Sequence, residues 1–217
     1  MKKWQLTPDL ARIQFDSSRE WLEAREGIGG SDASAILGLN PYKTNQELWM
    51  EKKGQMSPVD ISDKSYVKYG NDAESLLRAL FSLDYPEYTV EYYENNMLIN
   101  KKYPWAHASL DGELIDSEGR RGILEIKTSN MLQSMQWQKW DNQIQVLHYL
   151  LVTEYDFVVL KAQLKSVRDG EVRLTTKHYH IEREEVLDDI EMLKNEEEKF
   201  WHSLKSGQEP GLLLPEI

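Results

Sequence analysis

Apolar residues recur every three or four positions along several stretches of this chain, which is the spacing of an amphipathic helix. One such pattern predicts a helix over residues 66–83. In that helix Glu74 is in line with Leu77 and Phe81, so its carboxylate is expected to border the buried face. Further helices are predicted over residues 19–25, 33–37, 44–53, 133–152 and 183–204.

Short segments separated by turn residues predict strands between the two long helices. They cover residues 88–94, 97–100, 106–110, 113–115 and 122–127, and we interpret them as one central sheet. Residues 157–162 and 171–180 follow, and Asp169 and Gly170 between them predict a closing hairpin. Residues 54–63 are predicted to be a polar loop with Pro58.

The size and composition predict one domain. The chain has 217 residues, of which 40% are hydrophobic and 29% charged, so it can bury a full core. We expect one domain over residues 1–217, with its core over about 19–180 and an acidic amphipathic helix over about 183–204. The chain contains no Cys, which excludes disulfides, thiolate metal sites and cysteine nucleophiles. It has no apolar leader and no run of 18 apolar residues, so a cytoplasmic protein without membrane spans is expected.

The net charge of −11 argues at first against binding to nucleic acid, because phosphate binding normally leaves a basic surface. The charge is unevenly distributed, however. Residues 182–199 contain nine acidic and three basic residues, a local balance of −6. More than half of the negative charge therefore lies in the last predicted helix.

Glu125-Ile126-Lys127 is the only one of three Glu-x-Lys triplets that lies in a predicted strand. Side chains two apart in a strand share a face, so Glu125 and Lys127 point the same way while Ile126 faces a core. That arrangement suits a metal ligand with a charged neighbour over a substrate. The structural alternative is a simple ion pair on an edge or half-exposed strand.

Asp111 also has two interpretations. Asp-Gly between apolar residues is a strong hairpin-turn signal, which explains Asp111 without any function. The order of the other polar residues favours function instead. A helix with an inward carboxylate comes first, then Asp111 at a strand end, then the Glu-x-Lys strand, and last a helix with Gln143 beside its apolar stripe.

These residue types suit magnesium-dependent hydrolysis of a phosphodiester. Magnesium prefers oxygen ligands and keeps several waters, so two or three carboxylates with a strand carbonyl make a natural site. Two such ions can bind the attacking water and the leaving oxygen, while a nearby Lys favours the hydroxide form of that water. Gln143 could orient a phosphate oxygen or a water. The five His residues lack the spacing of metal ligands, although His148 could line the site beside Gln145.

The segment Gly29-Gly30-Ser31 before a predicted helix has two interpretations as well. A helix N-terminus after two glycines offers free backbone N–H groups to an anion. The alternative is that Ser31, or Asp32, is a plain N-cap. Neither a Walker A loop nor a dinucleotide-binding motif fits, because Gly-Lys-Ser/Thr is missing and no strand precedes Gly27.

Taken together, five segments of this chain resemble the YqaJ family of viral recombinases, which includes phage lambda exonuclease. The segments are Arg25-Glu26-Gly27-Ile28-Gly29-Gly30-Ser31-Asp32, Gly70…Glu74, Ser109-Leu110-Asp111-Gly112, Glu125-Ile126-Lys127 and Gln143-Ile144-Gln145…Tyr149. The resemblance covers roughly residues 19–155. There are two departures, because the family's Pro before the catalytic Asp is Leu110 here, and the segment between Lys127 and Gln143 is shorter.

The resemblance implies a restriction-endonuclease-like α/β/α core of the PD-(D/E)xK type, with a central mixed sheet flanked by helices. It implies a magnesium-dependent 5′-to-3′ exonuclease that degrades one strand of linear double-stranded DNA from its ends, for phage-type homologous recombination. Family members form rings around DNA, so a homo-oligomer, with a trimer favoured, and a single-strand annealing protein are the implied partners. A phage or prophage gene in a bacterial host would encode such a protein.

The resemblance also implies roles for individual residues. Asp111, Glu125 and the backbone carbonyl of Ile126 match metal ligands for two Mg²⁺ ions, for which Mn²⁺ would substitute. Lys127 matches the residue that activates water, and Glu74 matches an acid that acts on the metal through water.

Three further residues complete the implied site. Gln143 matches the amide on the helix that follows the Glu-x-Lys strand. Arg25 and Ser31 match residues that receive the terminal 5′-phosphate, so they would distinguish an exonuclease from an endonuclease or single-strand nuclease on the same core. A non-catalytic DNA-binding or assembly protein is a further alternative, although such a protein has no need of all three of Asp111, Glu125 and Lys127.

Overall fold

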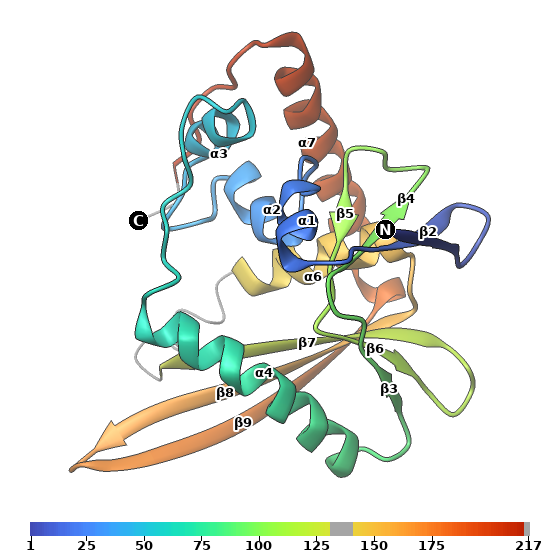
Figure 1. Cartoon of the computed structure of the whole chain (residues 1–217), viewed down its shortest axis with the longest axis vertical. Coiled ribbons are helices and arrows are strands. Elements are labelled where there is room, and N and C mark those ends of the chain that lie inside the picture. The colour runs from blue at the N-terminus through green and yellow to red at the C-terminus, as the bar shows by residue number, and fades with distance from the viewer. Residues whose placement is uncertain (131–140, 215–217) are drawn as a thin grey trace.

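The computed structural model describes residues 1–130 and 141–214, and in this part of the chain nine strands form two sheets (Figure 1). The smaller sheet has the strand order β1-β2-β4-β5, and the larger has the order β3-β6-β7-β8-β9. The strands are β1 (Lys2–Gln5), β2 (Leu10–Gln14), β3 (Thr89–Glu91), β4 (Asn96–Asn100), β5 (His107–Ala108), β6 (Gly112–Ile115), β7 (Arg121–Asn130), β8 (Phe157–Arg168) and β9 (Glu171–Glu182).

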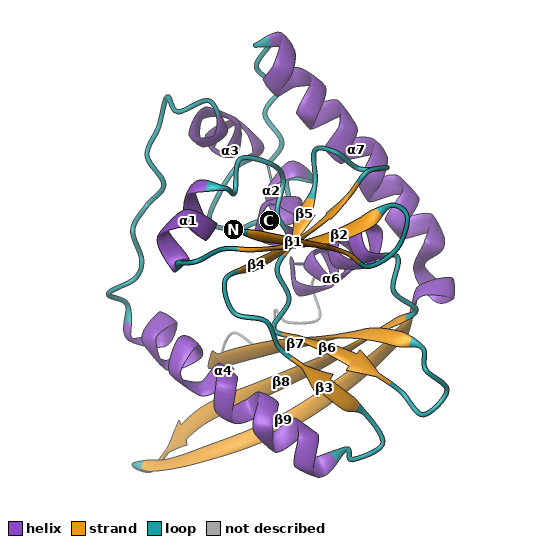
Figure 2. Ribbon diagram, turned by 45° about the vertical axis from the view of Figure 1, so that its right-hand side comes forward, coloured by secondary structure: helices purple, strands orange, loops and turns teal. Residues whose placement is uncertain are grey.

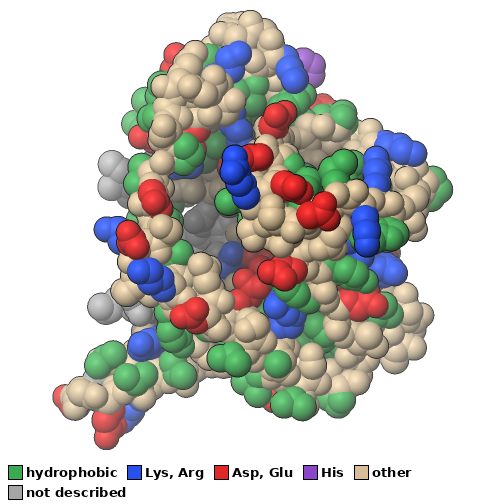
Figure 3. All heavy atoms as spheres, in the orientation of Figure 1, with side chains coloured by type: hydrophobic (Ala, Val, Ile, Leu, Met, Phe, Trp, Pro, Cys, Tyr) green, Lys and Arg blue, Asp and Glu red, His purple; other side chains and the backbone are tan. Residues whose placement is uncertain are grey.

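The helices surround these sheets. They are α1 (Ser18–Glu23), α2 (Gly30–Ile36), α3 (Asn45–Lys52), α4 (Ser65–Asp84), α6 (Asp141–Thr153) and α7 (Leu187–Ser206), with the short 3₁₀ helix η1 (Arg183–Val186) before α7. No helix in the described ranges is long and apolar enough to cross a membrane. The connection from α3 to α4 arches along one side of the molecule, and Figure 3 shows a hollow between it and the rest of the chain.

The larger sheet is mixed, and helices cover both of its faces. Strands β7 and β8 are parallel, with Gly122 opposite Phe157, and α6 lies in the connection between them. The other neighbouring strands of this sheet are antiparallel. Helix α4 buries Leu77 and Phe81 against one face, where Leu124 is part of the same apolar cluster. The predicted α/β/α fold with a mixed sheet is confirmed.

Helix α6 lies between the two sheets, as Figure 2 shows. The leucines and isoleucine of its stripe, among them Ile144, Leu147 and Leu151, are buried in one large cluster with α2, α3 and α7. Leu193 and Phe200 of α7 enter the same cluster. A helix that is apolar on most of its circumference suits this central position, because it meets protein on several sides.

Several predicted helices are confirmed. The pattern over residues 66–83 corresponds to α4, and the capping box at α3 is present, because the N–H of Glu47 donates to the Thr44 hydroxyl at 3.2 Å and the N–H of Thr44 donates to the Glu47 carboxylate at 2.7 Å. The predicted helix over 133–152 agrees with α6 from residue 141, while its first part, with Trp137 and Trp140, lies outside the described residues.

The prediction of one central sheet is wrong. Residues 97–100 and 106–110 contribute to the smaller sheet, together with two strands near the start of the chain that the pattern did not reveal. Strand β2 pairs with β4, and Leu10 is opposite Asn100. Such pairing depends on partners far away in the sequence, so local alternation of apolar residues cannot identify it.

The hairpin interpretation of Asp111 is also wrong. Strand β5 before it pairs with β4 in the smaller sheet, whereas β6 after it pairs with β3 and β7 in the larger one. Asp111 therefore stands where the chain passes from one sheet to the other.

A buried ion pair joins the two sheets. Arg12 of β2 contacts Glu113 of β6, and both side chains are at most 5% exposed. The second oxygen of Glu113 accepts a hydrogen bond from the Tyr155 hydroxyl at 2.7 Å, and Arg121 lies 3.5 Å from it. The Arg12 guanidinium also stacks 3.5 Å from the centre of the Tyr93 ring.

We expect Arg12→Met to lower the free energy of unfolding by about 3 kcal/mol, because it leaves the Glu113 carboxylate buried with one cation fewer. Urea unfolding followed by circular dichroism measures this loss. Lys3→Met on the exposed strand β1 is the control and should change stability by less than about 0.5 kcal/mol. Equal effects of the two substitutions would show that the ion pair does not hold the sheets together.

Candidate active site

The two central carboxylates, Asp111 and Glu125, lie together because β6 begins only at Gly112, opposite Leu124 of β7. The next residue of β7, Glu125, therefore has Asp111 beside it in place of a strand residue. The Asp111 carboxylate accepts the backbone N–H of Ile126 at 2.8 Å and so takes the place of a neighbouring strand. Residues 125–127 pair with β8 on one side and lie beyond the end of β6 on the other, so the triplet is at a local edge of the sheet. Glu125 is nevertheless only 1% exposed, so the interpretation as a half-exposed position is wrong for this residue.

Lys127 connects the carboxylates to helix α6. Its Nζ lies 2.6 Å from the Glu125 carboxylate, so the same-face ion pair is present. The ammonium also donates to the Gln145 side-chain carbonyl at 2.9 Å, and the Gln145 amide donates to the Tyr149 hydroxyl at 2.8 Å. The Lys127 side chain remains a quarter exposed, at 25%, so a substrate can reach it.

Helix α4 brings a third carboxylate to the edge of the site. Glu74 accepts a hydrogen bond from Arg78 at 3.0 Å, and the same guanidinium nitrogen donates to the backbone carbonyl of Asp111. Arg78 also stacks on the Tyr92 ring at 3.5 Å. The sequence analysis missed Arg78, although its position four residues after Glu74 on a helix could have indicated the contact.

The site carries more negative charge than its own residues neutralise. Burial raises the pKa of Asp111 well above its usual range, and the neighbouring Glu125 charge raises it further, while Lys127 lowers it. Burial likewise raises the pKa of Glu125 against the lowering effect of Lys127. The Lys127 ammonium lies 2.6 Å from one Glu125 oxygen, and the second oxygen is buried without a hydrogen-bond partner among the described residues. A buried carboxylate in this state favours a cation.

The donor set fits magnesium. In the described part of the chain, no three His, Asp or Glu side chains come close enough to hold a metal ion by themselves. Magnesium usually takes only one or two carboxylates and completes its octahedron with water and substrate phosphate oxygens, so Asp111 and Glu125 suffice. The N–H of Ile126 points to Asp111, and in a strand the carbonyl of the same residue points to the same side. The residues present therefore fit the ion that the sequence predicts.

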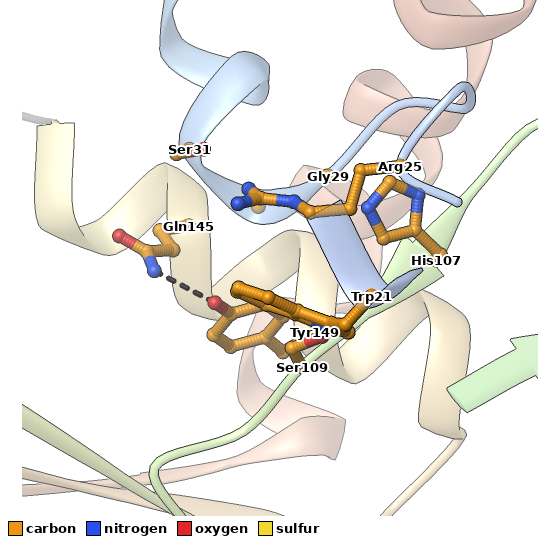
Figure 4. Close-up of a pocket in the computed structure, with 9 residues that line it drawn as sticks. Trp21, Arg25, Gly29, Ser31, His107, Ser109, Gln145 and Tyr149 are labelled. Carbon is orange, nitrogen blue, oxygen red and sulfur yellow. Dashed lines mark hydrogen bonds between the residues drawn. The ribbon is translucent and has the colours of Figure 1, made fainter. Parts of the chain in front are cut away.

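A pocket of about 150 Å³ opens beside this cluster, and Figure 4 shows its lining. Arg25 and Ser31, which the resemblance assigns to phosphate binding, both line it. Arg25 lies over the Trp21 ring at 4.8 Å, and the Trp21 indole N–H donates to the Ser109 hydroxyl at 3.1 Å.

Gln145 and Tyr149 form the wall of the pocket on the α6 side. Helix α2 reaches that wall only because residue 30 is Gly, since a Cβ there would lie 2.6 Å from the Tyr149 ring. Gln145 thus contacts Lys127 on one side and lines the pocket on the other. One amide side chain joins the pocket to the carboxylate cluster.

Some predicted site residues have a different place. Ser31 is not an N-cap, because α2 begins at Gly30 with Gly29 as the N-cap residue, and the Asp32 carboxylate accepts the Gly29 N–H at 3.0 Å. Gln143 is exposed on α6, and the amide that contacts Lys127 is Gln145, two residues later. The i, i+4 spacing of Gln145 and Tyr149 on one helix face could have indicated this.

His148 does not line the site, contrary to the sequence-based expectation. It is fully buried, where Nδ1 lies 2.7 Å from the Glu197 carboxylate and Nε2 lies 2.9 Å from the His107 carbonyl. Glu197 itself was expected on the acidic outer side of the last helix, but it is 0% exposed. His148 and the Trp105 indole, at 3.4 Å, provide the partners that make its burial tolerable.

His107 forms another wall of the pocket and was not predicted. Burial lowers its pKa to about 3, and the neighbouring cations His148, Lys52 and Arg25 lower it further. Its Nε2 has no hydrogen-bond partner among the described residues. The imidazole is therefore neutral in the folded protein at physiological pH.

Comparison with known proteins places these features in a family. Residues 20–156 match the family model described as the YqaJ-like viral recombinase domain. The chain is 33% identical over 211 residues to the uncharacterized protein YqaJ of Bacillus subtilis, a match that covers 94% of this chain and 61% of that relative. The chain thus spans less than two thirds of the relative's length.

Two solved structures share the fold. An alkaline exonuclease from Laribacter hongkongensis, LHK-Exo, matches with a TM-score of 0.63 and 19% identity, over 88% of this chain and 94% of that one. A phage-related exonuclease from Haemophilus somnus matches with a TM-score of 0.54 and 16% identity, over 83% and 96%.

We expect acid to destabilise the protein partly through His107. Its pKa is about 6.5 in the unfolded chain and about 3 in the folded one, so unfolding takes up a proton between these values and stability falls as the pH falls. The free energy of unfolding of the wild type, relative to His107→Gln, should fall by up to about 1.4 kcal/mol per pH unit from pH 6 to pH 4. Urea titrations at several pH values measure it, and parallel curves for the two proteins would contradict a neutral buried His107.

Proposed function

The chain belongs to the YqaJ-like viral recombinase domain family, and from this premise we propose that it is a magnesium-dependent exonuclease. It would degrade one strand of linear double-stranded DNA in the 5′-to-3′ direction. The observation that carries the proposal is the contact of Gln145 with Lys127 on one side and its place in the Arg25 pocket on the other. The proposed hydrolytic site around Lys127 and the proposed binding site for the strand end around Arg25 are therefore adjacent.

Each part of the site has a role in this reaction. Two Mg²⁺ ions held by Asp111, Glu125 and the Ile126 carbonyl, or Mn²⁺ in their place, would supply the charge that stabilises the attacking water and the leaving oxygen. Lys127 would hold the water in line, and its ammonium favours the deprotonated form of that water. Glu74 would contribute through water.

The pocket would bind the end of the strand. Arg25 is the cation of the pocket, and guanidinium groups bind phosphate oxygens with charge-assisted hydrogen bonds. Ser31 lines the same pocket, and the small volume of the pocket suits a terminal phosphate group. The proposed reaction releases deoxynucleoside monophosphates, and LHK-Exo, which shares the fold, has been solved in complex with dAMP.

A purely structural role for the carboxylates is disfavoured. The Glu125 carboxylate is buried beside two further acids, Asp111 and Glu74, with the Lys127 ammonium 2.6 Å from one of its oxygens, and burying so much like charge costs stability. A binding or assembly protein has no function for such destabilising carboxylates, whereas a metal-dependent nuclease needs them to bind its ions.

The proposal extends to assembly and biology. We propose a ring of several copies, a trimer by resemblance to the family, and a single-strand annealing protein as partner in phage-type recombination inside a bacterial cell. Exposed leucines on α4 are available for contacts between copies: Leu76, Leu80 and Leu83 are 71%, 43% and 79% exposed.

Asp111→Asn and Lys127→Ala should each lower the rate of nucleotide release from linear duplex by about 10²- to 10⁴-fold, since they remove a metal ligand and the group that activates water. Release of acid-soluble nucleotides in Mg²⁺ measures the rate, and a chelator should abolish it. Lys199→Ala, in another Glu-x-Lys triplet on the exposed side of α7, is the control and should keep full activity. Undiminished activity of Lys127→Ala would refute the assignment.

Wild-type enzyme should prefer a duplex with a 5′-phosphate over one with a 5′-hydroxyl, and Arg25→Ala should reduce that preference by about tenfold or more, because a charge-assisted hydrogen bond is lost. The ratio of initial rates on the two duplexes is the measurement. Arg19→Ala, on the exposed side of α1 and paired with Glu23, should leave the ratio unchanged. Equal rates on both duplexes with wild-type enzyme would rule out a pocket for the terminal phosphate.

A further inference from the structure

A second and larger hollow adjoins the phosphate pocket, and we refer to it as the groove. The volume of the groove is about 840 Å³, against about 150 Å³ for the pocket. Arg25 and Ser31 each line both the groove and the pocket. Leu22 of α1, α2, α3 and the C-terminal end of α7 form its walls, and Pro58 of the α3–α4 connection lines it as well. Figure 1 shows α3 and the end of α7 close together in the upper part of the molecule.

The groove is basic although the protein is acidic. Five of its lining side chains are basic and three are acidic, namely Arg25, Lys43, Lys52, Lys53 and Lys205 against Glu26, Asp32 and Glu51. Lys52 lies 2.7 Å from Asp32 and Lys43 lies 2.6 Å from Glu51, so each of these pairs is neutral. The remaining charged side chains are three cations, Arg25, Lys53 and Lys205, against the single acid Glu26. Against a net charge of −11 for the whole chain, this is a local concentration of positive charge.

Two ammonium groups face the groove from separate helices. Lys53 follows α3, and its Nζ lies 3.4 Å from the carbonyl of Leu204. Lys205 of α7 lies over the Trp201 ring at 4.3 Å. Within the described residues, neither Lys53 nor Lys205 has a carboxylate within 4 Å, so both are available to an anionic ligand.

We propose that the groove binds a single-stranded 5′ extension of the strand that is cut. The inference rests on the proposed nuclease function. A strand that ends in the pocket would bring its terminal phosphate to Arg25. A longer strand would continue past Arg25 into the groove, where Lys53 and Lys205 meet its backbone phosphates.

This arrangement changes which bond is cut first. With an extension in the groove, water attacks a phosphorus near the junction with the duplex, and the P–O3′ bond breaks. The extension leaves with a 3′-hydroxyl as an intact oligonucleotide, and the remaining strand keeps a 5′-phosphate. This new 5′-phosphate is the terminal group that the pocket would bind in the exonuclease steps that follow.

The test compares two duplexes of the same sequence. One is blunt with a 5′-phosphate, and the other carries a four-nucleotide 5′ extension with fluorescein at its 5′ end, a group too large for the pocket. We expect wild-type enzyme to digest the first and to release a labelled oligonucleotide from the second. Lys53→Glu/Lys205→Glu should slow release of the labelled oligonucleotide by about tenfold or more and leave digestion of the blunt duplex within about twofold.

The control is Lys194→Glu/Lys199→Glu, which makes the same change of charge on α7 outside the groove and should affect neither substrate. The inference is overturned if wild-type enzyme digests the blunt duplex but releases no label, or releases it only as a mononucleotide. It is also overturned if the groove variant slows both substrates equally. Failure of wild-type enzyme on the blunt duplex would instead refute the proposed function itself.

Discussion

The site depends on one hydrogen bond, in which the backbone N–H of Ile126 donates to the side chain of Asp111 and not to a neighbouring strand. Strand β6 begins at Gly112, and the side chain of the preceding residue, Asp111, accepts the next free N–H of β7. Because the Asp111 carboxylate takes the place of a strand here, Asp111 and Glu125 lie together at one end of the β6–β7 ladder. The same contact also fixes where the chain leaves the smaller sheet. The carboxylate cluster is thus a consequence of where the pairing of two strands ends.

Local pattern was sufficient for part of this structure. The stripe of α4 and the alternation of Glu125 and Lys127 are set by neighbours in the sequence, and both were predicted. The smaller sheet was not, because β2 finds its partner in β4, more than eighty residues away. Asp111 had a local explanation as a hairpin turn, and only the pairing of β5 and β6 with different sheets removes it.

The polar residues of the core show the same limit. Glu197 occurs in a run of acids that is typical of a solvated helix face, and nothing within the run distinguishes it. Its burial depends on His148 and Trp105, which come from other elements. For a similar reason the amide of α6 that contacts Lys127 is Gln145, on the face of the helix that packs against α2 at Gly30, whereas Gln143 is exposed. The burial of such polar residues is determined by tertiary contacts, and these contacts cannot be inferred from the local pattern of a single sequence.

The contact between His148 and Glu197 has a consequence for the protein during its synthesis. His148 of α6 holds the carbonyl of His107 on one side and Glu197 of α7 on the other. The three segments lie far apart in the chain, so this buried contact closes only after residue 197 has left the ribosome. A nascent chain can pair β6 with β7 earlier, but the core that holds α6 against the pocket is still incomplete. The pocket wall that α6 forms would therefore be held in place only after α7 has been synthesised.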